Sequence, residues 1–473
     1  MNKISIHGEW SSKMAFILAA TGSAVGLGNI WKFPYMVGQY GGGAFVITYL
    51  LCIIILCLPV MMAEVMLGKR GRSSPINTMR NLVRETGQSK LWVLLGWSGA
   101  LAGFLILSYY SVIAGWAMAY VPTLAVGTFT EINNIPAAEV KGFVDSIFSS
   151  LVGNPIELIS WHTTFIIITM IMVAGGVKGG LERAVTFMMP ALFIVLLVLV
   201  GYAMSTPNFL EGFHFMFNFN FNDLLYPNCT ETSCELSGEG LLAAMGQAFF
   251  SLSLGMGSIM VYGAYLPKDA SVGKVTTAVV LADTSVAILA GLIIFPIVFS
   301  NGLEPGAGVG LVFKTLPIAF GQMPFGTLFG TLFFVLLVLA ALSSSISLVE
   351  PAVAWLVETG KFTRKSASII TGISVWLTGL ITVFSFNIWS EVKPLAGLNL
   401  FELLDYLTTN IMLPLGGLLI AVFVGWLMKK TVVAEELNSS TDSFMYHIWY
   451  FLLRYITPLG VGIVFLNAIG VFS

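Results

Sequence analysis

The sequence predicts an all-α integral membrane protein, and three features support this prediction. Of its 473 residues, 57% are hydrophobic and only 10% are charged, a balance that soluble globular domains do not reach. The apolar residues form stretches of about 20 or more, the length with which an α-helix crosses a bilayer. A glycine-rich, helix-breaking run interrupts the first stretch, which indicates irregular backbone inside the membrane region.

Eleven apolar stretches are candidates for membrane spans. They cover roughly residues 14–38, 42–68, 91–124, 161–178, 185–205, 239–266, 272–300, 325–358, 367–385, 399–428 and 445–471. The first stretch has the apolar character of a signal peptide, but no cleavage site and polar flank follow it, so we expect a mature span. The chain is therefore expected to be one transmembrane domain over residues 1–473.

The basic residues predict the orientation of the chain. With eleven spans, most of the 22 Lys and Arg residues fall in the N-terminal segment and in the loops on the same side. The positive-inside rule then places the N-terminus in the cytoplasm and the C-terminus outside, in the cell inner (plasma) membrane. The net charge of −2 and the absence of a basic tract predict no nucleic-acid partner.

Two matched helix breaks predict a site near the middle of the membrane. Residues 22–34 contain three glycines within seven positions, and residues 247–258 of the sixth stretch contain a similar small-residue run. If spans 1–5 and 6–10 are two copies of one unit, both breaks fall in the first helix of a copy, and the copies are inverted. Paired breaks are typical of a transport site, because freed carbonyls suit a cation and freed amides suit a carboxylate. The alternative is that the glycines only allow close helix packing.

Several motifs carry a family resemblance. They are Glu9-Trp10, Gly28-Asn29-Ile30-Trp31-Lys32-Phe33-Pro34, Gly41-Gly42-Gly43-Ala44-Phe45, Lys178-Gly179-Gly180-Leu181-Glu182-Arg183, Gln247-Ala248-Phe249-Phe250-Ser251-Leu252-Ser253 and Ser343-Ser344-Ser345. With these motifs in order from about residue 9 to 458, the chain resembles the neurotransmitter:sodium symporter family, and its eleven spans resemble a bacterial amino-acid-transporting branch. The resemblance implies a LeuT-type five-plus-five inverted repeat with 11 transmembrane helices, of which helices 1 and 6 are broken. Repeat one would cover about 10–205, repeat two about 239–428, and an extra helix about 445–471.

The resemblance also implies two sodium sites. Sodium site 1 would use Ala24, Asn29 and Ser251 together with a carboxylate oxygen of the substrate, and sodium site 2 would use Gly22, Val25, Ala340, Ser343 and Ser344. Carbonyl and hydroxyl oxygens are suitable ligands for a hard cation. The alternative for the serine triplet is hydrogen bonding to the preceding helical turn.

Asp283 is the only acidic residue in the seventh stretch. The family often has an asparagine ligand of sodium site 1 nearby, and a one-residue shift aligns Asp283 with it, so direct ligation of sodium stays open. A carboxylate within a membrane span is costly, which favours a functional role over a structural one. Its charge would replace the chloride of chloride-dependent relatives, so no chloride requirement is expected.

The resemblance implies a binding site for a hydrophobic α-amino acid. The amides of Leu27 and Gly28 and the Tyr110 hydroxyl would hold a carboxylate, and carbonyls near Ala24, Phe250 and Ser253 would accept the ammonium. Monoamine carriers of the family have an aspartate where this chain has Gly26, so the substrate should bring its own carboxylate. The side-chain pocket would comprise Ala24, Ile106, Tyr110, Phe250, Met256, Ser344 and Leu348, with Ser251 alongside. One by one, these positions are also explained by ordinary helix packing.

The family's gates map onto five residues. Lys32 and Asp405 would close the outer side, although lysine lacks the planar fork of the arginine that relatives use. Trp10, Tyr265 and Glu358 would close the inner side, where His7 replaces an arginine. Trp10 could instead anchor the chain at the membrane interface.

The histidines and cysteines bear on the other functions that the sequence could have. The four histidines lack metal-ligand spacing and no nucleophile constellation is evident, so an enzyme is not expected. A channel or a substrate-sensing receptor of the same fold is the alternative to a symporter. Cys52 and Cys57 lie in the second stretch as small apolar residues, and Cys229 and Cys234 are spaced so that a disulfide is possible but not required.

Overall fold

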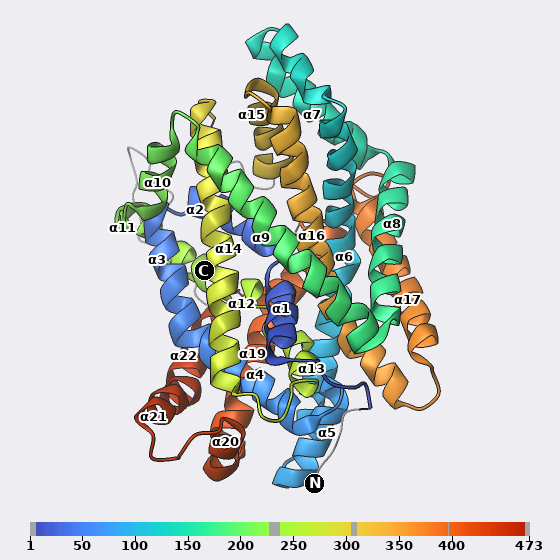
Figure 1. Cartoon of the computed structure of the whole chain (residues 1–473), viewed down its shortest axis with the longest axis vertical. Helices are drawn as coiled ribbons and strands as arrows, with labels where there is room; N and C mark the ends of the chain where they lie inside the picture. The colour runs from blue at the N-terminus through green and yellow to red at the C-terminus, as the bar shows by residue number, and fades with distance from the viewer. Residues whose placement is uncertain (1–5, 227–236, 304–309, 396, 469–473) are drawn as a thin grey trace.

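The computed structural model describes residues 6–226, 237–303, 310–395 and 397–468, and these residues are mostly helical (Figure 1). Within these ranges the only β-type pairing is an isolated bridge between Leu395 and Leu398. Cys229 and Cys234 lie outside the described residues, and so does their predicted disulfide. Cys52 and Cys57 are free.

Most helices run along the length of the molecule, and short π-helical or 3-10 segments (η) connect some of them (Figure 1). The elements of the first half are α1 Lys13–Ala24, η1 Gly28–Lys32, α2 Phe33–Gln39, α3 Gly43–Cys52, η2 Ile53–Cys57, α4 Leu58–Gly71, α5 Pro75–Thr86, η3 Lys90–Trp92, α6 Val93–Ala125, η4 Thr128–Asn134, α7 Ala137–Gly153, α8 Pro155–Ala174, η5 Val177–Glu182, α9 Arg183–Met204, α10 Phe209–Phe217 and α11 Phe221–Leu225.

The elements of the second half are α12 Glu239–Ser251, α13 Ser258–Ala264, α14 Val272–Ser300, η6 Leu311–Thr315, α15 Leu316–Gln322, α16 Gly326–Glu358, α17 Arg364–Ser385, α18 Leu400–Asp405, η7 Tyr406–Met412, α19 Leu413–Val422, η8 Phe423–Leu427, α20 Lys430–Glu436, α21 Phe444–Phe451, η9 Leu452–Ile456 and α22 Thr457–Ala468.

Eight helices in the described part of the chain are long and apolar enough to cross a membrane. A ninth candidate is the pair Lys13–Ala24 and Gly28–Gln39, whose axes differ by 52°. The stretch predicted at 239–266 is divided between α12 and α13, and the stretch predicted at 445–471 corresponds to the helical run from α21 to α22. Eight or nine spans are thus defined by length and composition, and eleven stays a prediction.

The first interruption lies between α1 and η1. Val25 leaves the helical conformation with ψ 112°, so the helical hydrogen-bond pattern stops at this point. Side chains replace the lost partners. The Asn29 side-chain oxygen Oδ1 accepts a hydrogen bond from the Gly26 N–H (3.1 Å), and the Tyr110 hydroxyl accepts one from the Leu27 N–H (3.3 Å). The break is stable because its freed amides are satisfied inside the protein.

The second interruption lies between α12 and α13. Ser253, Gly255 and Gly257 all have positive φ values, of 54°, 79° and 74°, so the chain cannot continue as a helix there. The Gly255 N–H donates to the buried carboxylate of Glu64 on α4 (3.1 Å). The Ser253 hydroxyl donates to the carbonyl of Ser23 in α1 (2.9 Å), which joins the two interruptions.

The interrupted helices lie against uninterrupted ones. The two 33-residue helices α6 and α16 pack along each other, and α1 contacts α16, α14 and α9. The α13 half-helix packs on α4 through two glycines, because a Cβ on Gly68 would lie 1.9 Å from the Met260 carbonyl oxygen and one on Gly263 would lie 2.6 Å from that of Val65. Larger side chains would push these helices apart.

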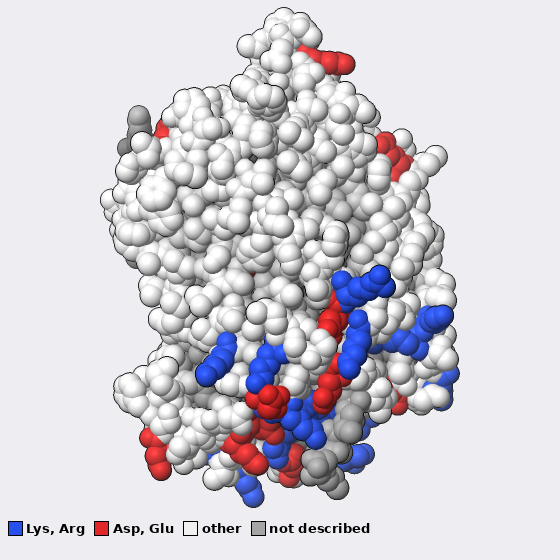
Figure 2. All heavy atoms as spheres, viewed as in Figure 1, with Lys and Arg blue, Asp and Glu red and all other residues white. Residues whose placement is uncertain are grey.

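Charged residues are concentrated at one end of the molecule. On the face shown in Figure 2, the Lys and Arg residues gather in the lower half, near the N-terminus, α5 and α20 in Figure 1. The middle of this face is almost free of charge, and its upper end carries a few acidic residues. This distribution fits a molecule with an apolar belt and one basic end.

Candidate functional site

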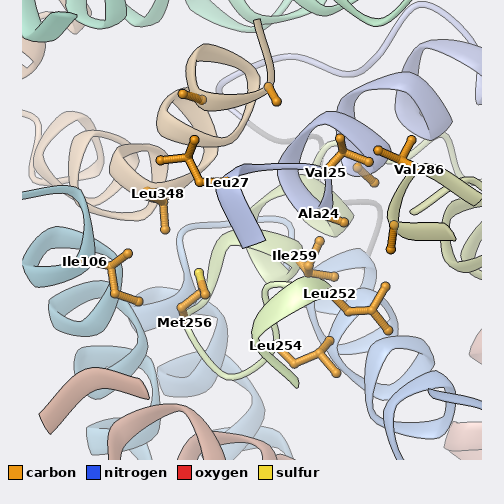
Figure 3. Close-up of a cluster of buried hydrophobic side chains, with 14 of the residues drawn as sticks. Ala24, Val25, Leu27, Ile106, Leu252, Leu254, Met256, Ile259, Val286 and Leu348 are labelled. Atoms are coloured by element: carbon orange, nitrogen blue, oxygen red, sulfur yellow. The ribbon is translucent and has the colours of Figure 1, made fainter. Parts of the chain in front are cut away.

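A small cavity lies between the two interruptions, next to α6 and α16. Its volume is about 20 Å³, and it is lined by Ala24, Gly26, Leu27, Gly28, Ile106, Tyr110, Phe250, Ser253, Met256, Ser344 and Leu348. The structure thus brings together eleven of the twelve residues predicted for substrate binding, whereas Ser251 does not line the cavity and contacts Asn29 and Asp283 instead. In Figure 3, Leu27, Ile106, Met256 and Leu348 surround the space between the broken helices.

The cavity contains no acidic side chain, and its polar groups come largely from the interruptions. Position 26 has little space for a side chain larger than that of glycine. An added Cβ would lie 2.9 Å from the Tyr110 hydroxyl and 3.3 Å from the Ser344 Oγ. Tyr110 and Ser344 are both buried. Apolar walls and a few convergent polar groups are typical of a small-molecule site.

A buried polar cluster adjoins the cavity. The Asn29 amide donates to Asp283 Oδ1 (2.8 Å) and to the Ser251 Oγ (3.0 Å), and the Ser251 hydroxyl donates to Asp283 Oδ2 (2.7 Å). Asp283 is fully buried, and no basic side chain of the described residues forms an ion pair with it. Three of the four residues predicted for the first sodium site therefore meet here, and Ala24 lies at the end of α1 beside them.

The second predicted sodium site lies where α1 contacts α16. A Cβ on Gly22 would lie 3.1 Å from the Ser343 Cβ, so these positions face each other. The Ser343 hydroxyl donates to the Ala340 carbonyl (3.0 Å), and the Ser344 hydroxyl donates to the Ser23 carbonyl (3.2 Å). Ser343 thus makes the hydrogen bond to the preceding turn that is the alternative explanation for this serine, while its Cβ lies close to Gly22 of α1.

The described residues contain no group of three His, Cys, Asp or Glu side chains that could hold a metal ion such as zinc. The available oxygens are carbonyls, hydroxyls, an amide and one carboxylate. Such a set suits a hard cation such as sodium.

A second cavity of about 120 Å³ lies on the other side of Phe250 and Tyr110. Lys32 and Asp405, the predicted outer gate, both line it but form no ion pair within 4.0 Å. Lys32 Nζ instead lies 4.7 Å from the centroid of the Phe250 ring, and the Thr409 hydroxyl donates to Asp405 (3.0 Å). Leu27, Gly28, Tyr110 and Phe250 line both cavities and lie between them.

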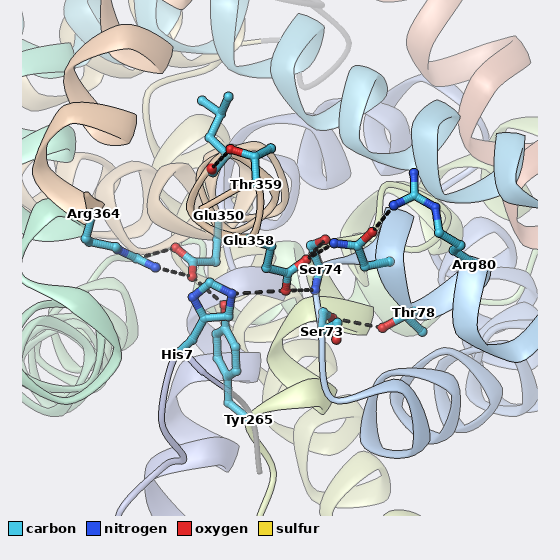
Figure 4. A network of polar contacts seen from close by, with 12 residues as sticks. His7, Ser73, Ser74, Thr78, Arg80, Tyr265, Glu350, Glu358, Thr359 and Arg364 are labelled. Carbon is cyan, nitrogen blue, oxygen red and sulfur yellow. Dashed lines mark hydrogen bonds and ion pairs between the residues drawn. The ribbon is translucent and has the colours of Figure 1, made fainter. Parts of the chain in front are cut away.

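The predicted inner gate is part of a dense polar network (Figure 4). Glu358 lies 3.0 Å from His7 Nε2 and accepts hydrogen bonds from the Ser74 N–H (2.6 Å) and the Asn77 amide (2.6 Å). Tyr265 donates to Glu350 (2.7 Å) rather than to Glu358.

Trp10 is 2% exposed and packs against Tyr262 and Tyr265, with its indole N–H donating to the Tyr262 carbonyl (3.2 Å). Its side chain is thus buried against α13 and does not lie exposed on the surface of the molecule.

Residues 7–13 form a strap across this end of the molecule. Besides His7 and Trp10, Glu9 pairs with Arg72 (3.2 Å), the Ser11 N–H donates to Glu182 (3.0 Å), and Lys13 pairs with Asp269 (2.7 Å). The Lys13 ammonium holds the pKa of Asp269 below its usual range. The strap contacts the loops that follow α4, α8 and α13.

Sequence reasoning missed three buried polar residues of the site. Glu64 holds the second interruption, Glu350 forms a two-pronged ion pair with Arg364, and Tyr49 donates to the Ser251 Oγ (3.1 Å). Glu64 and Glu350 are acidic residues within apolar stretches. Like Asp283, each is costly inside a membrane span, and this cost is the signal by which the sequence could have indicated them. Tyr49 carries no comparable signal, because a tyrosine in an apolar stretch is common.

Two interrupted helical segments that face each other around an apolar cavity, with a buried carboxylate beside it, are an arrangement typical of secondary transporters. The comparisons with known proteins agree. Residues 7–131 and 148–473 match the model of the sodium:neurotransmitter symporter family, and the chain belongs to this family. It is a sodium-dependent symporter of the membrane, and the family is not a class of enzymes.

Two bacterial relatives are similar to this chain over nearly their whole length. An uncharacterized sodium-dependent transporter of Bacillus subtilis is 37% identical over 98% of both chains, and one of Haemophilus influenzae is 33% identical over 97% of both. Among solved structures, MhsT in complex with L-phenylalanine matches with a TM-score of 0.86 and 39% identity, covering 98% of this chain and 99% of that one.

Proposed function

We propose that this symporter imports a hydrophobic L-amino acid, aliphatic or aromatic, together with sodium. The observation that carries the proposal is the apolar cavity without an acidic side chain, next to the amide of Leu27 and the hydroxyl of Tyr110. A substrate carboxylate would accept hydrogen bonds from both the Leu27 N–H and the Tyr110 hydroxyl. Hydrogen bonds to a charged acceptor are stronger than the neutral one that now joins these two groups. The similar protein MhsT was solved with L-phenylalanine, which has the expected chemistry.

Two sodium ions would accompany the substrate. Site 1 would use Ala24, Asn29, Ser251 and Asp283 with an oxygen of the substrate carboxylate, so that substrate and ion raise each other's affinity. Site 2 would use Gly22, Val25, Ala340, Ser343 and Ser344. The buried charge of Asp283 would make chloride unnecessary.

The proposed architecture is a LeuT-type inverted repeat of eleven spans, with helices 1 and 6 broken. The repeats would cover about 10–205 and 239–428, with an extra helix at about 445–471. The basic end in Figure 2 would lie in the cytoplasm by the positive-inside rule, with the C-terminus outside. The host membrane would be the inner (plasma) membrane.

Transport would proceed by alternating access. With a volume of about 20 Å³, the cavity is near the size of a single water, so its walls must part to admit an amino acid. Lys32 and Asp405 would approach each other when the outer side closes over Phe250. Trp10, Tyr265 and Glu358 would separate when the inner side opens.

The test is a binding screen of the twenty amino acids with and without sodium, followed by uptake into proteoliposomes. We expect sodium-dependent binding of apolar amino acids and accumulation against a concentration gradient when sodium is high outside. Binding without uphill uptake would indicate a receptor, and downhill flux alone would indicate a channel. Sodium-independent binding would contradict the proposed ion sites.

A further inference from the structure

Arg454 lies within a continuous helical run that is otherwise largely apolar. It belongs to η9, between α21 and α22, and is half-buried. Aromatic rings surround its guanidinium group: the Cζ atom lies 4.3 Å from the centroid of Trp426, 5.5 Å from that of Tyr455 and 5.8 Å from that of Tyr450. These contacts hold the cation over ring faces.

The charge of Arg454 has no carboxylate partner among the described residues. None of their ion pairs includes it, and its buried Nε atom has no hydrogen-bond partner. The Arg454 Nη1 donates one long hydrogen bond to the neutral Tyr450 hydroxyl (3.5 Å), which in turn donates to the Gly425 carbonyl (2.7 Å), so the charge itself is not compensated. An arginine in a membrane segment normally finds a partner, so an anion from outside the chain is expected.

The depth of Arg454 follows from its contact with η8. A Cβ added to Gly425 would lie 3.2 Å from the Arg454 Cα, so the two residues are at the same level. Gly425 precedes Lys430 by five residues, and the helix stops between them because Met428 and Lys429 are extended. Lys430 Nζ in turn lies 5.3 Å from the centroid of Tyr450. The two cations flank one tyrosine at the basic end of the molecule.

The surface around Arg454 has the character of a membrane interface. Trp426 is 51% exposed, Tyr455 47% and Phe451 54%, and the Trp426 indole N–H donates to the Arg454 carbonyl (3.1 Å). Trp and Tyr gather where acyl chains meet headgroups. An arginine at this depth reaches headgroups more readily than bulk water.

We propose that Arg454 and Lys430 form a binding site for the phosphate group of an anionic phospholipid in the adjacent leaflet. The guanidinium supplies charge-assisted hydrogen bonds to phosphate oxygens, and Trp426 and Tyr455 cover the glycerol and upper acyl region. The leaflet is the cytoplasmic one if the orientation proposed above holds, but the site itself does not depend on that orientation or on the substrate.

The test uses the purified full-length protein in detergent, with phosphatidylglycerol, phosphatidylcholine or inorganic phosphate added. Native mass spectrometry measures bound lipid, and thermal unfolding measures stabilisation. The variants are Arg454→Gln, Arg454→Lys and Lys430→Gln, and Lys361→Gln is the matched control because Lys361 is an exposed cation in the loop between α16 and α17.

We expect phosphatidylglycerol to bind and to raise the melting temperature more than phosphatidylcholine. One basic residue near a membrane surface contributes about 1 kcal/mol, so Arg454→Gln should bind phosphatidylglycerol about fivefold more weakly. Arg454→Lys should keep most of the binding, and Lys361→Gln should keep all of it. If Arg454→Gln does not fold, weaker phosphatidylglycerol binding by Lys430→Gln, measured in the same way, tests the site instead.

Equal phosphatidylglycerol binding by wild type, Arg454→Gln and Lys430→Gln would overturn the site. Equal stabilisation by inorganic phosphate would overturn the assignment to a lipid. A dimer that dissociates in Arg454→Gln, with lipid binding unchanged, would show that the counter-charge comes from a second copy of the chain.

Discussion

The buried carboxyl group of Asp283 accepts hydrogen bonds from Asn29 and Ser251, and no basic side chain of the described residues pairs with it. A buried charge is stable only when it is paired, hydrogen-bonded or neutralised by an ion. The Asn29 side chain also caps the first interruption through the Gly26 N–H. Cation binding and the shape of the substrate cavity are therefore linked through one asparagine.

The first prediction concerns this carboxylate. Transport should be equally fast in chloride and gluconate media, because the charge of Asp283 does the work of an anion. Asp283→Ser should slow uptake about tenfold or more through loss of a ligand, and chloride should then stimulate it. Uptake of a labelled amino acid into proteoliposomes measures both effects. A large loss of wild-type transport in gluconate would contradict the prediction.

The second prediction concerns the serines of α16. The double variant Ser343→Ala, Ser344→Ala should lose sodium-dependent binding, since two of five proposed ligands are removed, at a cost of several kcal/mol. Ser345→Ala is the matched control, because Ser345 contacts Thr169 on α8 instead. Scintillation proximity binding across a sodium titration measures the change. An unaltered sodium dependence in the double variant would rule out this site.

The third prediction concerns substrate choice at Gly26. Tryptophan or leucine should compete for the site, whereas tryptamine should not, because each unpaired polar group costs ~1–3 kcal/mol. Gly26→Asp should abolish amino-acid uptake by placing a carboxylate against that of the substrate. Competition binding provides the measurement. Similar affinities for tryptamine and tryptophan would exclude a shared carboxylate.

At the scale of elements, the contact between α4 and α13 fixes where the second broken helix lies. Gly68 and Gly263 allow the two backbones to meet, and Glu64 on α4 holds the Gly255 N–H at the interruption. One helix thus supports α13 by packing and by a hydrogen bond. The strap of residues 7–13 covers the same end of α13, where the Trp10 N–H donates to the Tyr265 carbonyl (3.0 Å).

The fourth prediction tests this contact. Gly68→Ala should lower the melting temperature, because its Cβ would meet the Met260 carbonyl oxygen at 1.9 Å and force the backbones apart. The expected cost is about 1–3 kcal/mol. Gly142→Ala in α7 is the control, since nothing lies near its Cβ and alanine favours a helix. Thermal unfolding by tryptophan fluorescence reports both. Equal melting temperatures would show that the helix pair adjusts freely.

At the scale of the whole molecule, the two interruptions lie between a basic end and an end with few charged residues. The polar network of Glu358 and the strap lies at the basic end, whereas Lys32 and Asp405 line a cavity on the opposite side of Phe250. The substrate cavity therefore lies between two barriers of different chemistry. Alternating access requires such a pair of barriers.

The fifth prediction concerns sidedness. In a background with Cys229 and Cys234 replaced by serine, Glu131→Cys should react with an impermeant maleimide on intact cells. Lys361→Cys should react only after the membrane is opened, because we propose that the basic end faces the cytoplasm. Both positions are exposed, so the pair is matched for access. The reverse labelling pattern would invert the proposed orientation.

From the amino-acid sequence alone come the membrane class, the long apolar helices and the two glycine-rich runs at which a helix is expected to stop. Apolar length and glycine content act locally, so patterns such as residues 22–28 predict where a helix stops. The family resemblance supplied candidate residues, and Gly26, Tyr110, Phe250 and Met256 do line one cavity.

Only the tertiary structure decided which polar groups meet. Asp283 contacts Asn29 across 254 positions of the chain, Tyr265 donates to Glu350 rather than Glu358, and Lys32 lies over Phe250 without pairing with Asp405. Such contacts depend on how rigid helices cross and on the rotamers that their packing leaves open. A linear pattern contains no information about those distances, which is why the gates and the partner of Tyr265 required the folded structure.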